Sequence, residues 1–392
     1  MSGLMKLLEQ FMVYQSLTED ATLGKIKLAE CYRKLNLQKH FQQTLRKAQQ
    51  SLEKRAIRNA DFYNYSYLLK WEEYLFLSAN TRSQSLNLQS ISDNLDLAFL
   101  SLKLRQSCFA ISHQAVYKAD YQLGLLPEIL QYVETNGLLA IPAISLYYYC
   151  YFALTQPREE QYFQTLKAQI FTHGHQFPAP EIRDLYLLAI NYCIKRLNEG
   201  NTSYFREGLD LYKKGLDRDI LLQNGQLSRF TYNNIVAMGL RTKEYDWTAH
   251  FIHQYRDFLE KGYRENTFAF NLARLEYERQ NYYEALGHLQ QAEYKDLLNN
   301  LIAKTLMLKI YFELGETKLL QSHLDAMKIF IRRKRVIGYH KKNYLNIVYY
   351  TQKLLNVNPY DKAAIQALKE QLQAEEVLTD RKWLLEQLKN IE

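Results

Sequence analysis

The chain of 392 residues contains few of the residues that interrupt regular structure. It has 14 glycines and six prolines, about half and about a third of the usual frequencies of roughly 7% and 5%. An all-β domain needs a tight turn after each short strand, and such turns depend on these two residues. Their scarcity argues against an all-β protein. A chain of this length then forms two or three ordinary domains or one extended repeat array.

Cysteine is also scarce, and its spacing excludes two common uses. The four cysteines lie 77, 42 and 43 residues apart without a CxxC pair: Cys31, Cys108, Cys150 and Cys193. This pattern argues against a disulfide framework or a zinc site and predicts reduced, buried thiols. The sequence MSGLMKLLEQFMVYQSL lacks the basic region, long apolar stretch and cleavage site of a signal peptide. We therefore expect a cytoplasmic protein.

The short motifs of common catalytic and cofactor sites are absent as well. The sequence contains no GxxxxGK[ST], GxGxxG, HExxH or GxSxG, which mark nucleotide, metal and nucleophile sites. His173 and His175 in THGH have no further potential ligand at metal-binding spacing before Glu181. We accordingly expect no enzyme activity, and no catalytic, cofactor-binding or metal-binding residues.

One long uncharged segment raises the question of a membrane span. No charged residue occurs from Thr135 to Pro157, a length that could cross a bilayer. Pro142, however, suits the first turn of a helix and disfavours helix at Ile141. The expected helix therefore covers only residues 142–155, whereas a span needs about 20. Because its apolar side chains lie on all sides, we predict a helix packed between other helices and no contact with a membrane.

Helical periodicity recurs along the chain at intervals close to 35 residues. Two consecutive segments, 270–292 and 306–327, each show an apolar helix, a short turn and a second amphipathic helix. Their expected turns are Gln280–Asn281 and Gly315–Glu316. Similar patterns occur in residues 26–48, 187–216 and 232–255. The sequence therefore predicts repeated helix pairs.

These pairs resemble the tetratricopeptide repeat (TPR), a helix–turn–helix unit of 34 residues. In 304–327, Leu308 stands at the small position of the first helix, Tyr311 at the aromatic position and Gly315 in the turn. Four residues depart from the family pattern. Leu320 and Met327 replace alanine, Glu276 replaces the aromatic residue in 269–292, and Phe41 replaces a small residue in the first unit. Further fitting positions are Leu272, Ala273, Tyr282, Ala285 and Ala292 in that unit, and Leu28, Ala29, Tyr32 and Ala48 in the first.

The resemblance implies an all-α fold, a right-handed superhelical solenoid of antiparallel helix pairs with about 16–20 helices. We expect one continuous array with N-terminal repeats in 1–135 (first unit about 26–48), central TPR-like repeats in 136–358 and capping helices in 359–392. First helices in such an array contact neighbours on both sides. Aromatic residues such as Tyr186 and Tyr192 should therefore pack between repeats.

Charge is the one local signal for a site. The formal net charge is +8, and residues 301–350 hold ten Lys/Arg against three Asp/Glu. The excess lies in a turn between two expected helices, which we name the basic turn: Arg332, Arg333, Lys334, Arg335, Lys341 and Lys342. Residues 332–335 suit the end of a helix, whereas Lys341 and Lys342 open the next one, where the helix dipole opposes them. The basic turn is either a candidate site for an anion or partner, or a solvated positive edge.

Three functions are compatible with these features. The TPR resemblance implies a non-catalytic scaffold or adaptor that binds a protein or peptide partner, for which an acidic partner is one option. The alternative is RNA binding through the basic turn and aromatic helices, although the cations form one cluster and do not recur in each repeat. A second alternative is a regulator that responds to a small ligand or peptide. We expect the protein partner.

Overall fold

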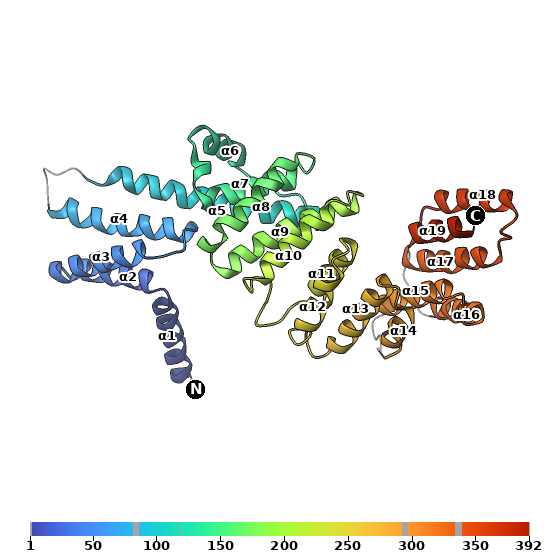
Figure 1. The fold of residues 1–392 in the computed structure, drawn as a ribbon. Coiled ribbons are helices and arrows are strands. Elements are labelled where there is room, and N and C mark those ends of the chain that lie inside the picture. Colours follow the sequence, from blue (N-terminus) through green and yellow to red (C-terminus); the bar gives the residue numbers. More distant parts are fainter. Residues whose placement is uncertain (1, 81–85, 118, 292–296, 334–338, 392) are drawn as a thin grey trace. The chain divides into compact units, whose positions relative to one another are not determined.

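The computed structural model describes residues 2–80, 86–117, 119–291, 297–333 and 339–391 (Figure 1). Within these residues it contains 19 α-helices, two short 3₁₀ helices and no β-strand; Gln223 and Gln226 form one isolated bridge. The expected all-α fold is confirmed. The chain divides into two compact units, Met1–Leu221 (unit 1) and Leu222–Glu392 (unit 2), so that the division falls inside the expected central segment.

The described helices of unit 1 include four long ones and several of 10 to 16 residues. They are α1 Ser2–Glu19, α2 Ala21–Lys34, α3 Gln38–Glu53, α4 Ala60–Asn80, α5 Leu88–Tyr117, α6 Leu126–Thr135, η1 Leu138–Ala140, α7 Pro142–Thr155, α8 Glu160–His173, η2 Gly174–Gln176, α9 Ala179–Asn198 and α10 Tyr204–Leu216. Residues 3–15 of α1 are all exposed, so this helix adds little to the core of unit 1.

The described helices of unit 2 are 10 to 18 residues long. They are α11 Arg229–Arg241, α12 Tyr245–Gln254, α13 Arg264–Glu278, α14 Tyr282–Gln291, α15 Leu297–Glu313, α16 Thr317–Arg333, α17 Tyr339–Asn356, α18 Lys362–Ala374 and α19 Arg381–Ile391. The described residues of the expected capping segment, 359–391, thus hold two helices, α18 and α19.

Helix α7 has the bounds that Pro142 predicted. Ile141 before it is extended, and eight of its 14 residues are buried, among them Tyr147 and Tyr148. The helix contacts α5, α8 and α9, and therefore the uncharged segment lies inside unit 1. None of the described helices combines the length and the apolar character that a membrane span requires.

Consecutive helices pack as hairpins, and alternate helices also touch (Figure 1). The hairpins include α2–α3, α4–α5, α7–α8, α9–α10, α11–α12, α13–α14 and α15–α16. In addition, α2 contacts α4, α7 contacts α9, α11 contacts α13, and α13 contacts α15. Helix pairs thus stack side by side within each unit, as neighbours in a repeat array do.

One turn motif recurs in five of these hairpins. In each, the second residue after the first helix has a left-handed backbone: Asn36, Gly200, Lys243, Gln280 and Gly315. The next backbone N–H donates to the carbonyl five residues earlier, over 2.8 to 3.0 Å. This is the Schellman motif, which satisfies carbonyls at the end of a helix. The two turns expected from the sequence, at Gln280 and Gly315, are confirmed.

Most positions that carry the TPR resemblance are buried. Leu308, Leu320 and Met327 have no exposed surface, and the same holds for Ala273. The core of unit 2 therefore accommodates the larger residues at the family's alanine positions. Leu28 is an exception, since 45% of its surface is exposed.

The cysteines follow the prediction at three of four positions. Cys108, Cys150 and Cys193 are buried, and all four thiols are free. The prediction of a buried thiol is wrong for Cys31, which is exposed. Helix α2 buries only one stripe, including Ile26 and Ala29, and Cys31 lies outside that stripe.

A buried carboxylate joins four segments of unit 1. Glu181 of α9 accepts hydrogen bonds from the Tyr147 hydroxyl (2.8 Å) and the Asn59 amide (2.8 Å), and it lies 3.5 Å from Arg105 of α5. Only 3% of the surface of Glu181 is exposed. Burial, together with this carboxylate, raises the pKa of Tyr147, so the phenol remains a donor at neutral pH. We name this group the Glu181 network.

Tyr148→Asp should destabilise unit 1 by about 3–5 kcal/mol, because it places an unpaired charge in a buried position. The Tyr148 hydroxyl donates to Glu134, so the new carboxylate would also meet a like charge. Thermal unfolding of the variant measures the loss. Tyr360→Asp is the control, since 93% of Tyr360 is exposed. Equal melting temperatures for the two variants would contradict the buried position of α7.

Gly315→Ala should cost about 1 kcal/mol, because the left-handed backbone there (φ 70°) disfavours a side chain. No atom lies within 4 Å of an added Cβ, so the effect comes from the backbone alone. Gln280→Gly should have the opposite sign and stabilise by about 0.5 kcal/mol, because glycine relieves the strain but gives the unfolded chain more freedom. Chemical denaturation of both variants tests the motif, and effects of equal sign would count against it.

Candidate functional site

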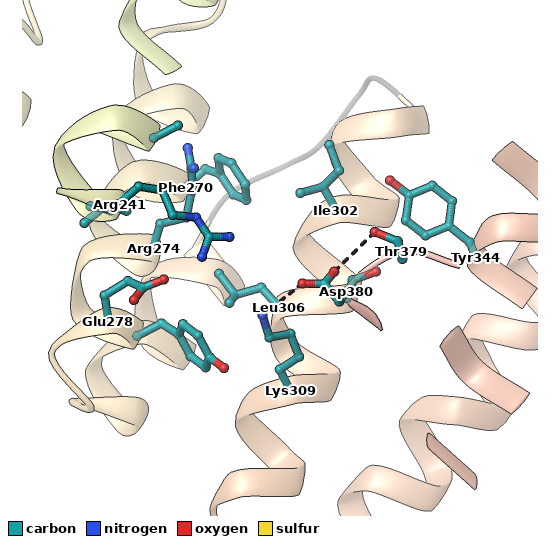
Figure 2. A pocket seen from close by; sticks show the side chains of 14 residues that line it. Arg241, Phe270, Arg274, Glu278, Ile302, Leu306, Lys309, Tyr344, Thr379 and Asp380 are labelled. Carbon is teal, nitrogen blue, oxygen red and sulfur yellow. Dashed lines mark hydrogen bonds and ion pairs between the residues drawn. The ribbon is translucent and has the colours of Figure 1, made fainter. Parts of the chain in front are cut away.

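The candidate site is a cleft in unit 2 with a cavity of about 180 Å³. Helices α11, α13 and α15 provide most of its lining, and Tyr344 of α17 and the segment before α19 complete it (Figure 2). Each of α11, α13 and α15 is the first helix of a stacked hairpin. The cleft therefore lies along equivalent elements of three consecutive pairs.

Arg274 of α13 is the central cation of the cleft. Its Nη1 donates to Oδ1 of Asn271 (3.2 Å) and to the carbonyl oxygen of Asn233 (3.5 Å). Asn271 is itself fully buried and donates to the side chain of Asn233 over 2.7 Å. Two asparagines thus fix the guanidinium, while Phe270 lies 5.7 Å from it as a cation–π neighbour.

The charge of Arg274 is not neutralised by an adjacent acid. Among the described residues, no carboxylate lies within 4 Å of its guanidinium, and Glu278 acts on it only at longer range. Burial and the nearby charge of Arg241 lower the pKa of Arg274 to about 10. Arg241 is the last residue of α11, and Figure 2 shows it on the same side of the cavity as Arg274.

The opposite wall combines apolar side chains with a neutralised lysine (Figure 2). Ile302 and Leu306 of α15 face the cavity. Lys309, one turn further along α15, pairs with Asp380 at 3.1 Å and lies 4.9 Å from the ring of Tyr277. The lining as a whole contains three cations and two carboxylates. One positive charge is therefore in excess.

A partly buried carboxylate holds the helices around the cleft together. Glu313 at the end of α15 accepts hydrogen bonds from the hydroxyls of Tyr277 (2.5 Å) and Tyr282, and from the indole Nε1 of Trp383 (2.6 Å). These donors come from α13, α14 and α19. We name this group the Glu313 network. It fixes the wall that carries Lys309 relative to the wall that carries Arg274.

The basic turn expected from the sequence lies elsewhere in unit 2. Arg332 and Arg333 are exposed at the end of α16, and Lys341 and Lys342 are exposed in the first turn of α17. Lys334 and Arg335 lie outside the described residues. Lys342 has a partner that the local sequence did not indicate, because its Nζ lies 3.3 Å from a carboxylate oxygen of Glu375. Glu375 thus compensates part of the positive charge that the dipole of α17 opposes at Lys341 and Lys342.

The sequence contained a signal for the cleft. Arg274 and Lys309 each follow the small position of their repeat, Ala273 and Leu308, and are 35 residues apart. In stacked first helices, equivalent positions lie on the same face, so the repeat register itself brings these two cations to one surface. The two cations form no cluster along the chain, because they come from different repeats.

The histidines considered for metal binding are not brought to further ligands. His173 ends α8, and its Nδ1 lies 3.4 Å from the amide of Gln176. His175 lies in the following 3₁₀ helix. In the part of the chain that the structure describes, no three His, Cys, Asp or Glu residues are placed to hold a metal ion.

No model of a known protein family matches the chain, and no curated protein matches it in sequence. A helical repeat architecture supports many functions, and only the geometry and chemistry of a site distinguish them.

Arg274→Gln should stabilise unit 2 by about 1 kcal/mol, because it removes a desolvated cation beside Arg241. Part of the guanidinium faces the open cavity, so the gain is smaller than full burial would give. The folded-state pKa lies below the ordinary 12.5. The cost of the charge is therefore fully present below pH 10 and is relieved between about pH 10 and 12.5.

The expected rise in melting temperature near pH 7 is about 2–4 °C. Arg279→Gln is the matched control directly after α13, since Arg279 pairs with Asp246 (3.0 Å) and Glu276 (3.3 Å). This variant should lose stability or stay unchanged. A lower melting temperature for Arg274→Gln would show that the guanidinium is satisfied within the protein.

Proposed function

We propose that this protein is a non-catalytic scaffold or adaptor that binds a protein or peptide partner through a TPR-like, right-handed superhelical surface. The observation that carries the proposal is the cleft along the first helices α11, α13 and α15. Such a surface presents side chains of successive repeats to one extended ligand. Its apolar wall and excess positive charge suit a segment that carries apolar and acidic side chains.

Two features of the cleft support binding over a purely structural role. Arg274 is held in place by Asn271 and Asn233 without a carboxylate to neutralise it, at a cost in stability. Ile302, which also lines the cavity, exposes 42% of its surface. A bound partner would neutralise the charge of Arg274 and cover the exposed surface of Ile302. Costs of this kind are typical of binding sites, where stability is lost for function.

RNA binding through the basic turn is the second candidate. It is supported by the exposure of Arg332, Arg333 and Lys341, for which no carboxylate lies within 4 Å among the described residues. The pairing of Lys342 with Glu375 reduces the charge available to phosphates. A regulator that responds to a small ligand is the third candidate, and the cavity itself supports it.

Paired charge reversals separate these candidates. Arg241→Glu with Arg274→Glu changes the cleft, and Arg332→Glu with Lys341→Glu changes the basic turn. Each protein is used to capture partners from native lysate with and without nuclease. We expect the cleft variant to lose a protein partner that the turn variant and nuclease treatment leave in place.

Loss of the captured material on nuclease treatment, and in the turn variant alone, would instead establish the nucleic-acid function. A titration with a single-stranded oligonucleotide then gives a second measure. Three phosphate contacts by Arg332, Arg333 and Lys341 imply that the logarithm of the binding constant falls with the logarithm of the salt concentration. The expected slope is about −2, from about −0.7 per contact. A partner held by apolar and buried polar contacts should show a shallower dependence.

A further inference from the structure

The cleft has the charge and size of a site for a small organic anion. One positive charge is in excess in its lining, because Lys309 is neutralised by Asp380 (3.1 Å) and Glu278 partly offsets the two arginines. A monoanion would bring the lining to neutrality, whereas a phosphate dianion would leave it negative. A buried group is most stable when its charge is balanced.

The geometry of Arg274 favours a planar anion. Its Nη1 is used by Asn271 and Asn233, and no other hydrogen bond of its side chain occurs among the described residues. Nε and Nη2 therefore remain for a ligand. Two parallel N–H groups of a fixed guanidinium match the two oxygens of a carboxylate. Arg241 on the same side of the cavity adds a second positive charge (Figure 2).

The remainder of the cavity suits an apolar group attached to the carboxylate of the ligand. Phe270, Ile302 and Leu306 line it from two helices, and Tyr344 closes the side toward α17 (Figure 2). The volume is about 180 Å³, and an apolar cavity of roughly 150 Å³ is known to accept benzene. There is thus room for one aromatic ring or a short aliphatic chain.

We propose that this cleft binds a free monocarboxylic acid with a short aromatic or aliphatic body, which pairs with Arg274 and packs against Phe270 and Leu306. This function goes beyond partner binding. A small acid in the cleft occupies the surface offered to a partner side chain. It would therefore compete with the partner and make binding responsive to the concentration of the acid.

The test is calorimetric titration of the full chain with 3-phenylpropionate. Two matched probes keep the ring and change the head group: 3-phenylpropionamide removes the charge, and phenyl phosphate replaces the carboxylate with a dianion. We expect the carboxylate to bind and each of the other two to bind at least about tenfold more weakly. The amide loses the charge-assisted pair with Arg274, and the phosphate dianion leaves the lining with a net negative charge.

The variants Arg274→Gln and Arg279→Gln test the position of the site. The first should weaken 3-phenylpropionate binding about tenfold or more. The second, directly after α13 and outside the cleft, should leave it unchanged. Circular dichroism melting of each variant confirms that it is folded. Equal binding by both variants, preference for the amide or phosphate, or no carboxylate binding at millimolar concentration would overturn the proposal.

A peptide probe separates a free acid from a partner's side chain. In acetyl-Gly-Glu-Phe-Gly-amide the only carboxylate is a side chain, so tighter binding of this peptide than of 3-phenylpropionate would overturn the claim for a free acid. The result is independent of the proposed scaffold function. Acid binding can be present while the cleft variants still capture the partner, and partner capture can depend on the cleft without any response to acid.

Discussion

The arrangement of both units depends on a buried or partly buried carboxylate that accepts hydrogen bonds from tyrosine hydroxyls. Glu181 does this in unit 1, with Tyr147 as donor, and Glu313 does it in unit 2, with Tyr277 and Tyr282. A buried carboxylate is costly unless its oxygens are satisfied, so each network requires several helices to hold their donors in place at once. A chain with 32 tyrosines can supply such donors from aromatic residues that also fill the core.

The cleft depends on the second of these networks. The Glu313 network ties α13, α14 and α19 to α15, and these helices carry or adjoin Arg274, Lys309 and Asp380. The positions of the charges are thus set by packing that has no direct contact with a ligand. Such support from outside a site is what keeps its side chains in place before binding. The cleft therefore combines a rigid frame with one cation that the frame does not neutralise.

Local patterns in the sequence predicted the elements of the fold, because each pattern acts over one or two turns. Pro142 was sufficient to fix the start of α7, and the residues around Gln280 and Gly315 indicated two turns. The site, by contrast, depends on contacts between residues that are far apart in the sequence. The pairing of Lys342 with Glu375 and the approach of Arg241 to Arg274 arise from different helices, and their geometry follows from packing. Only the repeat register indicates such a contact from the sequence, because Arg274 and Lys309 occupy equivalent positions of successive repeats.

Hairpins and stacked neighbours give the chain mostly local contacts, but the Glu181 network is an exception. Asn59 and Glu181 are 122 residues apart. At a synthesis rate of about 5–20 residues per second, the ribosome needs about 6–24 s to make that segment. Until then the amide of Asn59 has only the neighbouring Asp61 (3.2 Å) as an acceptor, and the hydroxyl of Tyr147 must stay hydrated or bind elsewhere. Helix pairs can form as they leave the ribosome, yet the core of unit 1 closes only when α9 has emerged.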